Sequence, residues 1–501
     1  YFTLAGCFSF AAVSTQKKQT MKKLSAIIAM FITVIMFTTS CTKEDDKPTL
    51  SSEKQISGIV FNQFTPAVVA SIDQNNKTAT ASIPANSNIT ALVPTITVSN
   101  GATINPASGT VVDFTLPVIF TVTAEDGSTT AYTVSVTLEG GGMGSETLSG
   151  GMSANRTLVN RNDGIDYIID GYFYIEGNAL LTIEPGVKIA FTSVNSGISV
   201  GENAGLKMAG TAQNPIVLTG PVNNQNKGSW DGVSIYSARS DNQFEYVQFI
   251  NGGSNSDWAV VVLYYNAKLK MNHCMMDGSL GSGVMTTDLS QKITSFDNNT
   301  IKNCDKYPLV ISDLAQCSVL NETTQLTLNS KPVVWVNGLN MTEDFTLNKT
   351  TVPYAFENSF YLENNLTIGK GVQLLFSADC WINVINSGRI QVNGTAAEPV
   401  LFSKLNASAS NWEGLYISND KDNTLNYCTI EYAGSNSSFK CNIVLEYSSK
   451  LIMSNVTIDN SRYYGIGLHD DSMITHTNVT FSGNPSGNVY NFDTDEVSSG
   501  L

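Results

Sequence analysis

Leu181-Thr-Ile-Glu-Pro-Gly-Val-Lys-Ile-Ala-Phe191 returns with a few substitutions as Leu366-Thr-Ile-Gly-Lys-Gly-Val-Gln-Leu-Leu-Phe376. Two further segments follow in the same order in both places: Gly210-Thr-Ala-Gln-Asn-Pro-Ile216 with Gly394-Thr-Ala-Ala-Glu-Pro-Val400, and Trp230-Asp-Gly-Val-Ser-Ile235 with Trp412-Glu-Gly-Leu-Tyr-Ile417. The offset between the two copies changes only from 185 residues at Leu181 to 182 residues at Trp230. A duplication built from short β-rich units predicts a solenoid.

Short apolar runs repeat throughout the region around these segments. Examples are Gly197-Ile-Ser-Val200, Pro215-Ile-Val-Leu218 and Gly232-Val-Ser-Ile235. Three strands per turn would give coils of about 20–29 residues, as in parallel β-helices. About 350 residues then predict roughly 14 coils, or a rod of ~65–70 Å at ~4.8 Å per coil.

The repeated phrases resemble the right-handed parallel β-helix proteins of the pectate-lyase-like superfamily. They are Leu-Thr-Ile-x-Pro-Gly-Val, Gly-Thr-Ala-x-x-Pro-Ile and Trp-x-Gly-Val-x-Ile, and the resemblance spans about residues 148–490. It implies the fold and leaves the activity open, because this scaffold hosts lyases, hydrolases, adhesins and passive spacers.

A separate strand-rich unit precedes the solenoid. Ile56–Phe61, Thr78–Ile83, Thr95–Val98, Val118–Val122 and Ala131–Val136 are short strand-like runs separated by turn residues, which is typical of a β-sandwich. The segments Leu92–Ser99, Pro106–Gly109 and Thr123–Ser128 resemble the immunoglobulin-like spacer domains of bacterial surface lipoproteins. That resemblance implies a domain that holds the solenoid away from a membrane.

The predicted fold class is therefore all-β, with an immunoglobulin-like β-sandwich followed by an internally duplicated right-handed parallel β-helix. The expected organisation is upstream translated residues 1–20, signal peptide 21–40, tether 41–55, sandwich 56–138, Gly-rich linker 139–147, first β-helix copy 148–318 and second copy 319–501.

The leader predicts where the protein goes. Met21-Lys-Lys-Leu-Ser is followed by an apolar run from Ala26 to Phe37 and by Thr38-Thr-Ser-Cys41, which has the layout of a secretory signal. Small residues ending at a cysteine resemble a bacterial lipobox, which implies acylation of Cys41 and a membrane as partner through that anchor; a plain signal peptide is the alternative. Lys43-Glu-Asp-Asp46 resembles the export tag of surface lipoproteins, which implies an outer-membrane lipoprotein that faces the cell exterior, although charged runs also form solvated tethers.

Composition excludes some classes of partner. The chain has 28 Lys and Arg against 43 Asp and Glu, a formal net charge of −15, and the acidic body argues against nucleic acid. Six of the eight cysteines lie in the solenoid without CxxC spacing, so we expect small apolar core residues rather than a disulfide framework or a sulfur-ligated metal.

One acidic cluster in the solenoid invites a catalytic interpretation. His469, Asp470 and Asp471 are adjacent, and hydrolases of the resembled superfamily use clustered aspartates with a nearby histidine. Adjacent residues on a strand point to opposite faces, however, whereas a general acid and base must converge on one bond. We therefore predict a solvated turn here and keep these three residues as weak catalytic candidates.

Metal binding is equally weakly indicated. Asp420 and Asp422 could together hold calcium, but two carboxylates are too few for an ion that takes six to eight oxygens. The sequence predicts no cofactor, with calcium as the alternative.

Aromatic residues offer a third route to function, since their rings bury a large area against the C–H faces of sugars. Trp230 and Trp412 recur in both copies, which favours a packing role. The candidates for ligand binding are Trp258, Tyr264, Tyr265, Tyr463 and Tyr464.

The sequence supports three functions. The first is a non-catalytic binding or adhesion module at the cell surface, for a polysaccharide or a surface protein. The second is a polysaccharide lyase or glycoside hydrolase with an unrecognised site. The third is a structural envelope spacer.

Overall fold

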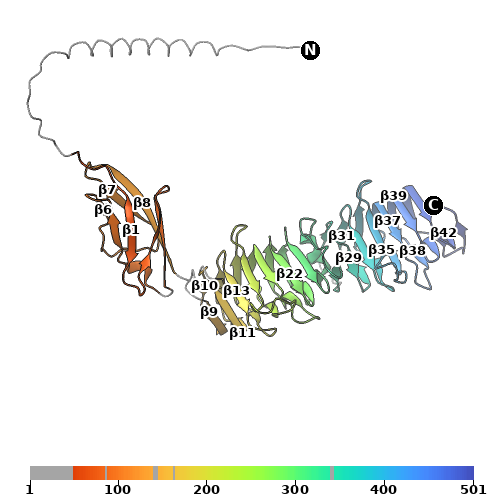
Figure 1. Cartoon of the computed structure of the whole chain (residues 1–501). Helices are drawn as coiled ribbons and strands as arrows, with labels where there is room; N and C mark the ends of the chain where they lie inside the picture. The colour runs from red at the N-terminus through yellow and green to blue at the C-terminus, as the bar shows by residue number, and fades with distance from the viewer. Residues whose placement is uncertain (1–48, 85–86, 139–144, 162–163, 339–342) are drawn as a thin grey trace, which may run out of the picture.

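The structure is a computed structural model, and it describes residues 49–84, 87–138, 145–161, 164–338 and 343–501. The predicted signal peptide and Cys41 lie outside the described residues. Figure 1 shows a strand-rich N-terminal domain and a long β-solenoid that runs from β10 to β42. No helix in the described part of the chain is both long and apolar enough to cross a membrane.

The N-terminal domain is a two-sheet sandwich. The smaller sheet contains β1 (Ile56–Phe61), β2 (Val68–Val69) and β5 (Thr95–Val98), and the larger contains β3 (Ser71–Asp73), β4 (Thr78–Ile83), β6 (Thr103–Asn105), β7 (Val118–Thr123) and β8 (Thr129–Leu138). A short 3₁₀ helix, η1 (Ile89–Ala91), joins β4 to β5. Phe61, Phe114 and Phe120 pack together in the core between the sheets. The immunoglobulin-like expectation is confirmed for this region.

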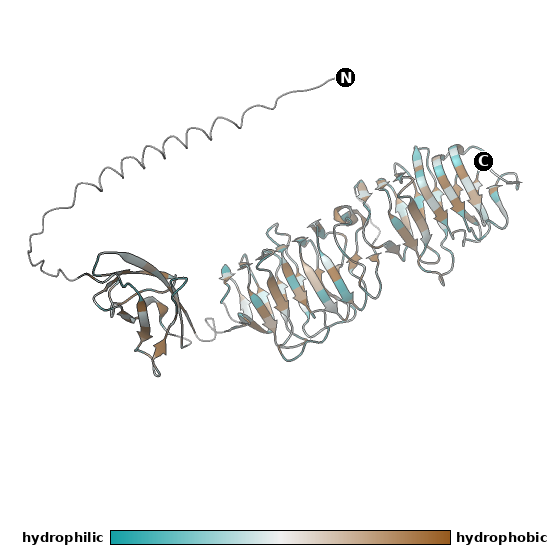
Figure 2. Cartoon of the chain, turned by 45° about the horizontal axis from the view of Figure 1, so that its top comes forward, coloured by the Kyte–Doolittle hydropathy of each residue, from teal (hydrophilic) through white to brown (hydrophobic). Residues whose placement is uncertain are grey.

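The solenoid has about 14 turns and begins at residue 146, two residues before the predicted start. Its strands pair in parallel with those of the next coil, and buried residues alternate with more exposed ones along strands such as β12 and β16. In Figure 2, hydrophobic and hydrophilic positions are interspersed along the strands of the solenoid. One continuous core therefore fills the rod. The parallel β-helix expectation is confirmed.

The first copy has three faces. One sheet contains β10 (Arg156–Leu158), β12 (Leu180–Ile183), β15 (Gly205–Ala209), β18 (Gln243–Glu245), β21 (Lys268–Asn272) and β24 (Lys292–Ser295). The strands of the other two faces are β9 (Glu146–Met152), β11 (Tyr167–Ile175), β13 (Lys188–Phe191), β14 (Gly197–Val200), β16 (Ile216–Thr219), β17 (Gly232–Ile235), β19 (Val247–Ile250), β20 (Ala259–Leu263), β22 (Met275–Ser279), β23 (Ser282–Thr286), β25 (Thr300–Cys304) and β26 (Leu309–Ile311).

The second copy repeats this plan with its own sheet boundaries. Two faces contain β27 (Val334–Val336), β28 (Phe345–Leu347), β29 (Tyr354–Phe356), β31 (Asn365–Ile368), β32 (Gln373–Phe376), β34 (Arg389–Asn393), β35 (Val400–Lys404), β37 (Asn423–Glu431), β39 (Lys450–Asp459) and β41 (Met473–Ser482). The third contains β30 (Phe360–Leu362), β33 (Trp381–Val384), β36 (Gly414–Ile417), β38 (Cys441–Leu445), β40 (Tyr464–Leu468), β42 (Gly487–Asn491) and β43 (Val497–Ser498).

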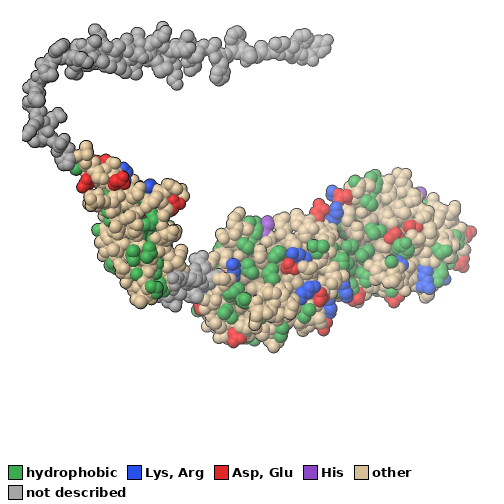
Figure 3. Space-filling model, in the orientation of Figure 1, with side chains coloured by type: hydrophobic (Ala, Val, Ile, Leu, Met, Phe, Trp, Pro, Cys, Tyr) green, Lys and Arg blue, Asp and Glu red, His purple; other side chains and the backbone are tan. Residues whose placement is uncertain are grey.

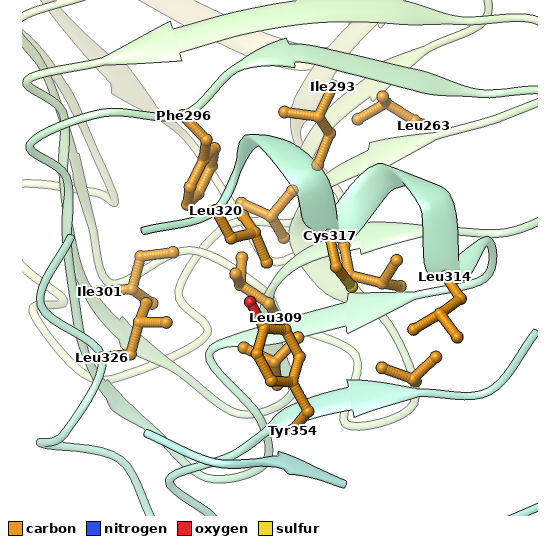
Figure 4. Packing of buried hydrophobic residues seen from close by; sticks show 14 of the residues in the cluster. Leu263, Ile293, Phe296, Ile301, Leu309, Leu314, Cys317, Leu320, Leu326 and Tyr354 are labelled. Carbon is orange, nitrogen blue, oxygen red and sulfur yellow. The ribbon is translucent and has the colours of Figure 1, made fainter. Parts of the chain in front are cut away.

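A 3₁₀ helix marks the junction between the copies. η2 (Leu314–Val319) contacts both β24 and β28, where a strand of the first sheet would otherwise continue. Leu314 and Cys317 point from η2 into the core, among Leu309, Ile293 and Tyr354 (Figure 4). The predicted division between the copies at residues 318 and 319 falls inside this helix.

The coils are less uniform than predicted. Leu181 pairs with Leu206, 25 residues further on, but Lys207 pairs with Gln243, 36 residues further on. The longer turn exceeds the expected 20–29 residues because an extended loop separates β16 from β17. Such insertions leave the stacked strands intact and change only the surface of one face.

The tryptophans of the duplicated motif lie in the core. Trp230 stacks on Phe191 at 4.1 Å between ring centroids, and Trp412 stacks on Phe376 at 4.3 Å. Both indoles are fully buried. The six solenoid cysteines are also buried and free, as expected for small apolar residues.

Candidate functional site: an aromatic groove on the first β-helix copy

A groove of about 360 Å³ lies on the face formed by β11, β14, β17 and β20. Its walls are aromatic and its floor is made of small residues. We call it the aromatic groove; it is lined by Tyr172, Tyr174, Ser199, Asp231, Gly232, Val233, Ser234, Tyr236, Asn255, Trp258, Ala259, Val262 and Tyr264.

The register of the coils explains why this face is hollow. Tyr172 of β11 stands beside Gly197 of β14, which stands beside Gly232 of β17. Two residues further along, Tyr174 is followed in the same way by Ser199 and Ser234. Outward side chains of successive coils stack along the rod, so two rows of Gly and Ser leave a depression next to the tyrosines.

The two glycines are required by close backbone approach. A Cβ atom on Gly197 would lie 2.6 Å from the carbonyl oxygen of Gly232. A Cβ atom on Gly232, whose φ is +156°, would lie 2.4 Å from the carbonyl oxygen of Val260. Any larger residue would therefore push the coils apart, and the floor of the groove stays low.

Aromatic rings line both ends of the groove. Tyr172 and Tyr174 stack at 5.9 Å on the β11 side. On the β20 side, Tyr236 and Tyr264 stack at 4.6 Å with only 7° between their planes, and Trp258 lies 6.0 Å from Tyr264. Trp258 is 41% exposed and Tyr174 is 45% exposed, so their rings are available to a ligand.

Asp231 supplies the single carboxylate among the described lining residues. Its Oδ1 accepts a hydrogen bond from Ser254 Oγ at 2.9 Å, and its Oδ2 accepts one from the hydroxyl of Tyr172. Partial burial raises the pKa of Asp231 above its usual value, with the Ser254 hydrogen bond acting in the opposite direction. These two hydrogen bonds fix the carboxylate in position and use only part of its capacity to accept hydrogen bonds.

The tyrosine hydroxyls remain hydrogen-bond donors at neutral pH. Burial raises the pKa of Tyr264 to about 12, and the neighbouring Tyr236 acts in the same direction. Burial also raises the pKa of Tyr236. A protonated phenol can donate to a ligand oxygen while its ring packs against an apolar face.

Three of the five sequence-predicted aromatic candidates meet here. Trp258 and Tyr264 line the groove, and Tyr265 stands at its edge, 5.8 Å from Tyr236 and 60% exposed. Sequence reasoning did not select Tyr172, Tyr174, Tyr236 or Asp231. The alternation of Tyr172-Phe-Tyr174 and the acid inside the duplicated Trp-Asp-Gly segment were signals that could have found them.

The other two aromatic candidates lie on the second copy. Tyr464 stacks on Tyr490 at 4.6 Å within the β40–β42 face. Tyr463 has Lys440 and Arg462 against its ring, at 5.8 and 5.5 Å from the centroid. These contacts engage both rings with the protein itself.

His469 forms part of a polar contact between the last coils. Its Nδ1 lies 2.9 Å from Asp493 Oδ1, and its ring stacks on Tyr447 at 3.7 Å between centroids. A hydrogen bond from the backbone N–H of Asp470 lowers the pKa of Asp493, and a weaker contribution from the His469 hydrogen bond acts in the same direction.

The two adjacent carboxylates turn away from each other. Asp470 accepts a hydrogen bond from Asn491 Nδ2 at 2.7 Å in the following coil. Asp471 accepts from the backbone N–H of Ser448 at 2.9 Å and from the Ser448 hydroxyl at 2.7 Å in the preceding coil. Each carboxylate therefore links its own coil to a neighbouring coil.

The calcium candidates lie in an exposed loop. Asp420 pairs with Lys421 Nζ at 2.8 Å, and that contact lowers the pKa of Asp420. Across the residues that the structure describes, no group of three or more His, Cys, Asp or Glu side chains is placed to hold a metal ion.

Two family models match parts of the chain. Residues 59–136 match a model described as "SGBP, N-terminal", where SGBP denotes a surface glycan-binding protein. Residues 150–265 match a model described as a pectate-lyase-like β-helix domain. The second match ends at Tyr265 and so contains the aromatic groove. No curated protein matches the chain.

Solved structures match only short stretches. One is a presumptive glycoside hydrolase from Bacteroides thetaiotaomicron, with 31% identity over 20% of this chain and 27% of that one and a TM-score of 0.14. Another is a presumptive secreted protein from Bacteroides fragilis, with 24% identity over 17% of this chain and 95% of that one and a TM-score of 0.14. TM-scores of this size establish no shared overall fold. The family matches and the described structure together identify an SGBP N-terminal domain joined to a pectate-lyase-like β-helix.

Proposed function

We propose that this chain is a surface protein that binds a glycan without cleaving it, and that the glycan lies in the aromatic groove. The observation that carries the proposal is the groove itself, with stacked tyrosines at both ends and a fixed carboxylate between them. The SGBP N-terminal domain supports the same function independently.

The dimensions of the groove suit a short stretch of a polysaccharide. It crosses four strands from β11 to β20, which is three intervals of about 4.8 Å, or roughly 14 Å in all. Trp258 and Tyr174 offer exposed rings near the two ends. Aromatic side chains contribute large, rigid contact areas at low entropic cost, which makes them effective anchors for sugar rings.

The lining of the groove favours binding over hydrolysis. Glycoside hydrolysis commonly uses two carboxyl groups on either side of the scissile bond. Asp231 is the one carboxylate among the described lining residues, and both its oxygens already accept protein hydrogen bonds. Binding needs only the contacts that are present.

The leader completes the proposal. Acylation at Cys41 would anchor the chain in the outer membrane, and the N-terminal sandwich would hold the solenoid outward. We expect metabolic labelling with a fatty acid to tag the expressed chain and Cys41→Ser to lose the label. An unlabelled wild-type chain would contradict the anchor and leave the groove proposal intact.

Affinity electrophoresis tests glycan binding directly. The chain from residue 42 to residue 501 would migrate through native gels that contain a panel of polysaccharides. We expect at least one polysaccharide to retard the chain, and Trp258→Ala to restore free migration. Tyr463→Ala is the matched control, because it removes an aromatic candidate outside the groove.

Two results would contradict the proposal. Unretarded migration through every gel would remove glycan binding as the function. Release of oligosaccharides during incubation with the retarding polysaccharide would replace the binding role with a catalytic one.

A further inference from the structure

The aromatic groove carries a single formal charge, and that charge is negative. The described lining residues include Asp231 but no Lys, Arg or His. Beside the groove, Lys306 Nζ is paired with Asp257, the residue before Trp258, at 2.9 Å. A ligand inside the groove therefore meets a carboxylate that no lining cation neutralises.

The carboxylate is held in place by the protein. The hydroxyl of Tyr172 and Ser254 Oγ donate to different oxygens of Asp231, and the backbone N–H of Asp231 donates to the carbonyl of Ser196 at 2.9 Å. An ionised carboxylate offers about four acceptor positions, of which these side chains use two. The remaining positions can accept hydrogen bonds from the hydroxyl groups of a sugar.

An anionic sugar would meet a different environment. Its carboxylate or sulfate would lie against Asp231 in a partly desolvated groove, where like charges repel more strongly than in water. Burial raises the pKa of Asp231, which is the sign of a group that already lacks full solvation. A second negative charge would add to that cost.

Several lysines of the first copy lie on a different face from the groove. Lys207, Lys270 and Lys292 belong to β15, β21 and β24, in the sheet that does not line the groove. Lys268 and Lys292 stand side by side in the ladder between β21 and β24. Figure 3 shows that charged side chains are scattered among a surface dominated by other residues. These lysines therefore stand apart from the aromatic rings of the groove.

We propose that the aromatic groove selects glycans whose bound sugar units carry no carboxylate or sulfate group. This inference rests on the proposed glycan-binding function and names the ligand class of the same site. It also sets the groove apart from an acidic-polysaccharide site, which would need a cation where Asp231 stands.

The test compares uncharged and anionic polysaccharides in native gels. The uncharged probes are xyloglucan, mixed-linkage β-glucan, galactomannan and arabinan, and the anionic probes are polygalacturonate, alginate and chondroitin sulfate. Retardation counts as groove-dependent when Trp258→Ala removes it. We expect groove-dependent retardation from at least one uncharged probe and from no anionic probe.

A charge variant sharpens the comparison. Chemical oxidation of the primary CH2OH groups of the retarding uncharged probe to carboxylates should weaken wild-type binding at least tenfold. Asp231→Asn should shrink that penalty to about threefold or less, because the repelling charge is gone. Asp420→Asn is the matched control, since it removes one negative charge from an exposed loop of the second copy and should leave the penalty unchanged.

The outcomes are distinguishable. Groove-dependent retardation by polygalacturonate, alginate or chondroitin sulfate would overturn the selection against anions and leave the glycan-binding proposal standing. An equal penalty in wild type and Asp231→Asn would remove the role assigned to Asp231. Absence of groove-dependent retardation by every probe would overturn the proposed function and this inference together.

Discussion

The two copies of the β-helix share a sequence motif but differ on one face. In the first copy, the outward positions of β14 and β17 include Gly197 and Ser234, and the face is a groove. The duplicated positions in the second copy are Trp381 and Tyr416, on β33 and β36. The same backbone plan thus produces an open site or a filled surface, depending on a few outward residues.

Large aromatic rings fill the second-copy face. Tyr416 is only 5% exposed and lies 6.3 Å from Trp381 and 5.2 Å from Phe439 between ring centroids. Its hydroxyl donates to Glu413 Oε2 at 3.3 Å, where Glu413 is the duplicate of Asp231. Asp231 thus lines a groove in the first copy, whereas its duplicate Glu413 accepts a hydrogen bond from the buried Tyr416 in the second.

The junction also moves these faces into different sheets. The groove sheet continues from β20 through β23, β26, β27 and β29 into β32, which duplicates β13 rather than β14. The duplicate of β14 is β33, which pairs with β30 in the separate sheet that ends at β43. The two copies therefore share the same coil structure, whereas the residues on their outer surfaces differ.

The largest effect should come from making the first copy resemble the second. Ser234→Tyr would place a ring on the groove floor, between the β11 and β20 walls. We expect glycan binding to fall at least 100-fold, or about 2.7 kcal/mol, because the ligand volume is occupied. Affinity electrophoresis would measure the loss, and circular dichroism would confirm the fold. Binding within threefold of wild type would show that the glycan does not use the groove.

The reverse change should act on stability. Tyr416→Ala would leave a cavity in the packed aromatic face and cost about 3 kcal/mol in the free energy of unfolding. Chemical denaturation would detect the loss as a lower midpoint. Ser234→Ala, at the duplicate position, should cost less than ~1 kcal/mol, since its side chain is small and partly solvated. Equal losses at both positions would contradict the distinction between a filled and an open face.

A matched pair of tyrosines gives a smaller effect on binding. Tyr174 and Tyr361 are duplicate outward residues, 45% and 55% exposed. We expect Tyr174→Ala to weaken glycan binding about tenfold, or ~1.4 kcal/mol, through loss of ring contact. Tyr361→Ala should leave binding unchanged. Titration calorimetry would compare the two, and an equal loss in both would place the ligand outside the first copy.

The smallest effect concerns acid stability at another duplicated position. Glu398 replaces Asn214 of the first copy, and hydrogen bonds from Lys349 and then Lys370 lower its pKa from 4.5 to about 2. A carboxyl group whose pKa is lower in the folded chain stabilises the fold when the pH is above its pKa in the unfolded chain. That stabilisation is lost as the pH falls from about 4.5 to about 2.

Glu398→Gln should therefore lower the thermal midpoint slightly at pH 6 and much less at pH 2. Thermal melts across that range would measure the difference. Asn214→Ala, which removes no charge, should shift the midpoint equally at both pH values. A pH-independent effect of Glu398→Gln would show that its ion pairs add no stability.

The fold was largely readable from the sequence because its signals are local. Ile56–Phe61, Thr78–Ile83 and Thr95–Val98 were predicted as strands and form β1, β4 and β5 with the same bounds. Gly197–Val200 and Gly232–Ile235 were also predicted with the bounds of β14 and β17. Short alternating runs between turn residues specify strands directly.

The groove was harder to predict from the sequence than the fold, because it depends on the register between coils. Trp258 and Tyr264 were selected as aromatic residues, but nothing local places them near Tyr172, 86 residues upstream of Trp258. The coil that contains β17 has a long loop, so counting a fixed period misaligns the faces. Asp231 gains its raised pKa from burial, which no sequence pattern expresses.

Tryptophan accessibility tests the central claim most directly. Of the five tryptophans, Trp230 and Trp412 are fully buried, Trp335 is 7% exposed and Trp258 is 41% exposed. A Trp381→Phe background removes the remaining partly buried indole, so iodide quenching then reports mainly on Trp258. A saturating amount of the retarding polysaccharide should protect Trp258 and reduce the quenching at least twofold. Unchanged quenching at saturation would contradict the assignment of the aromatic groove as the glycan site.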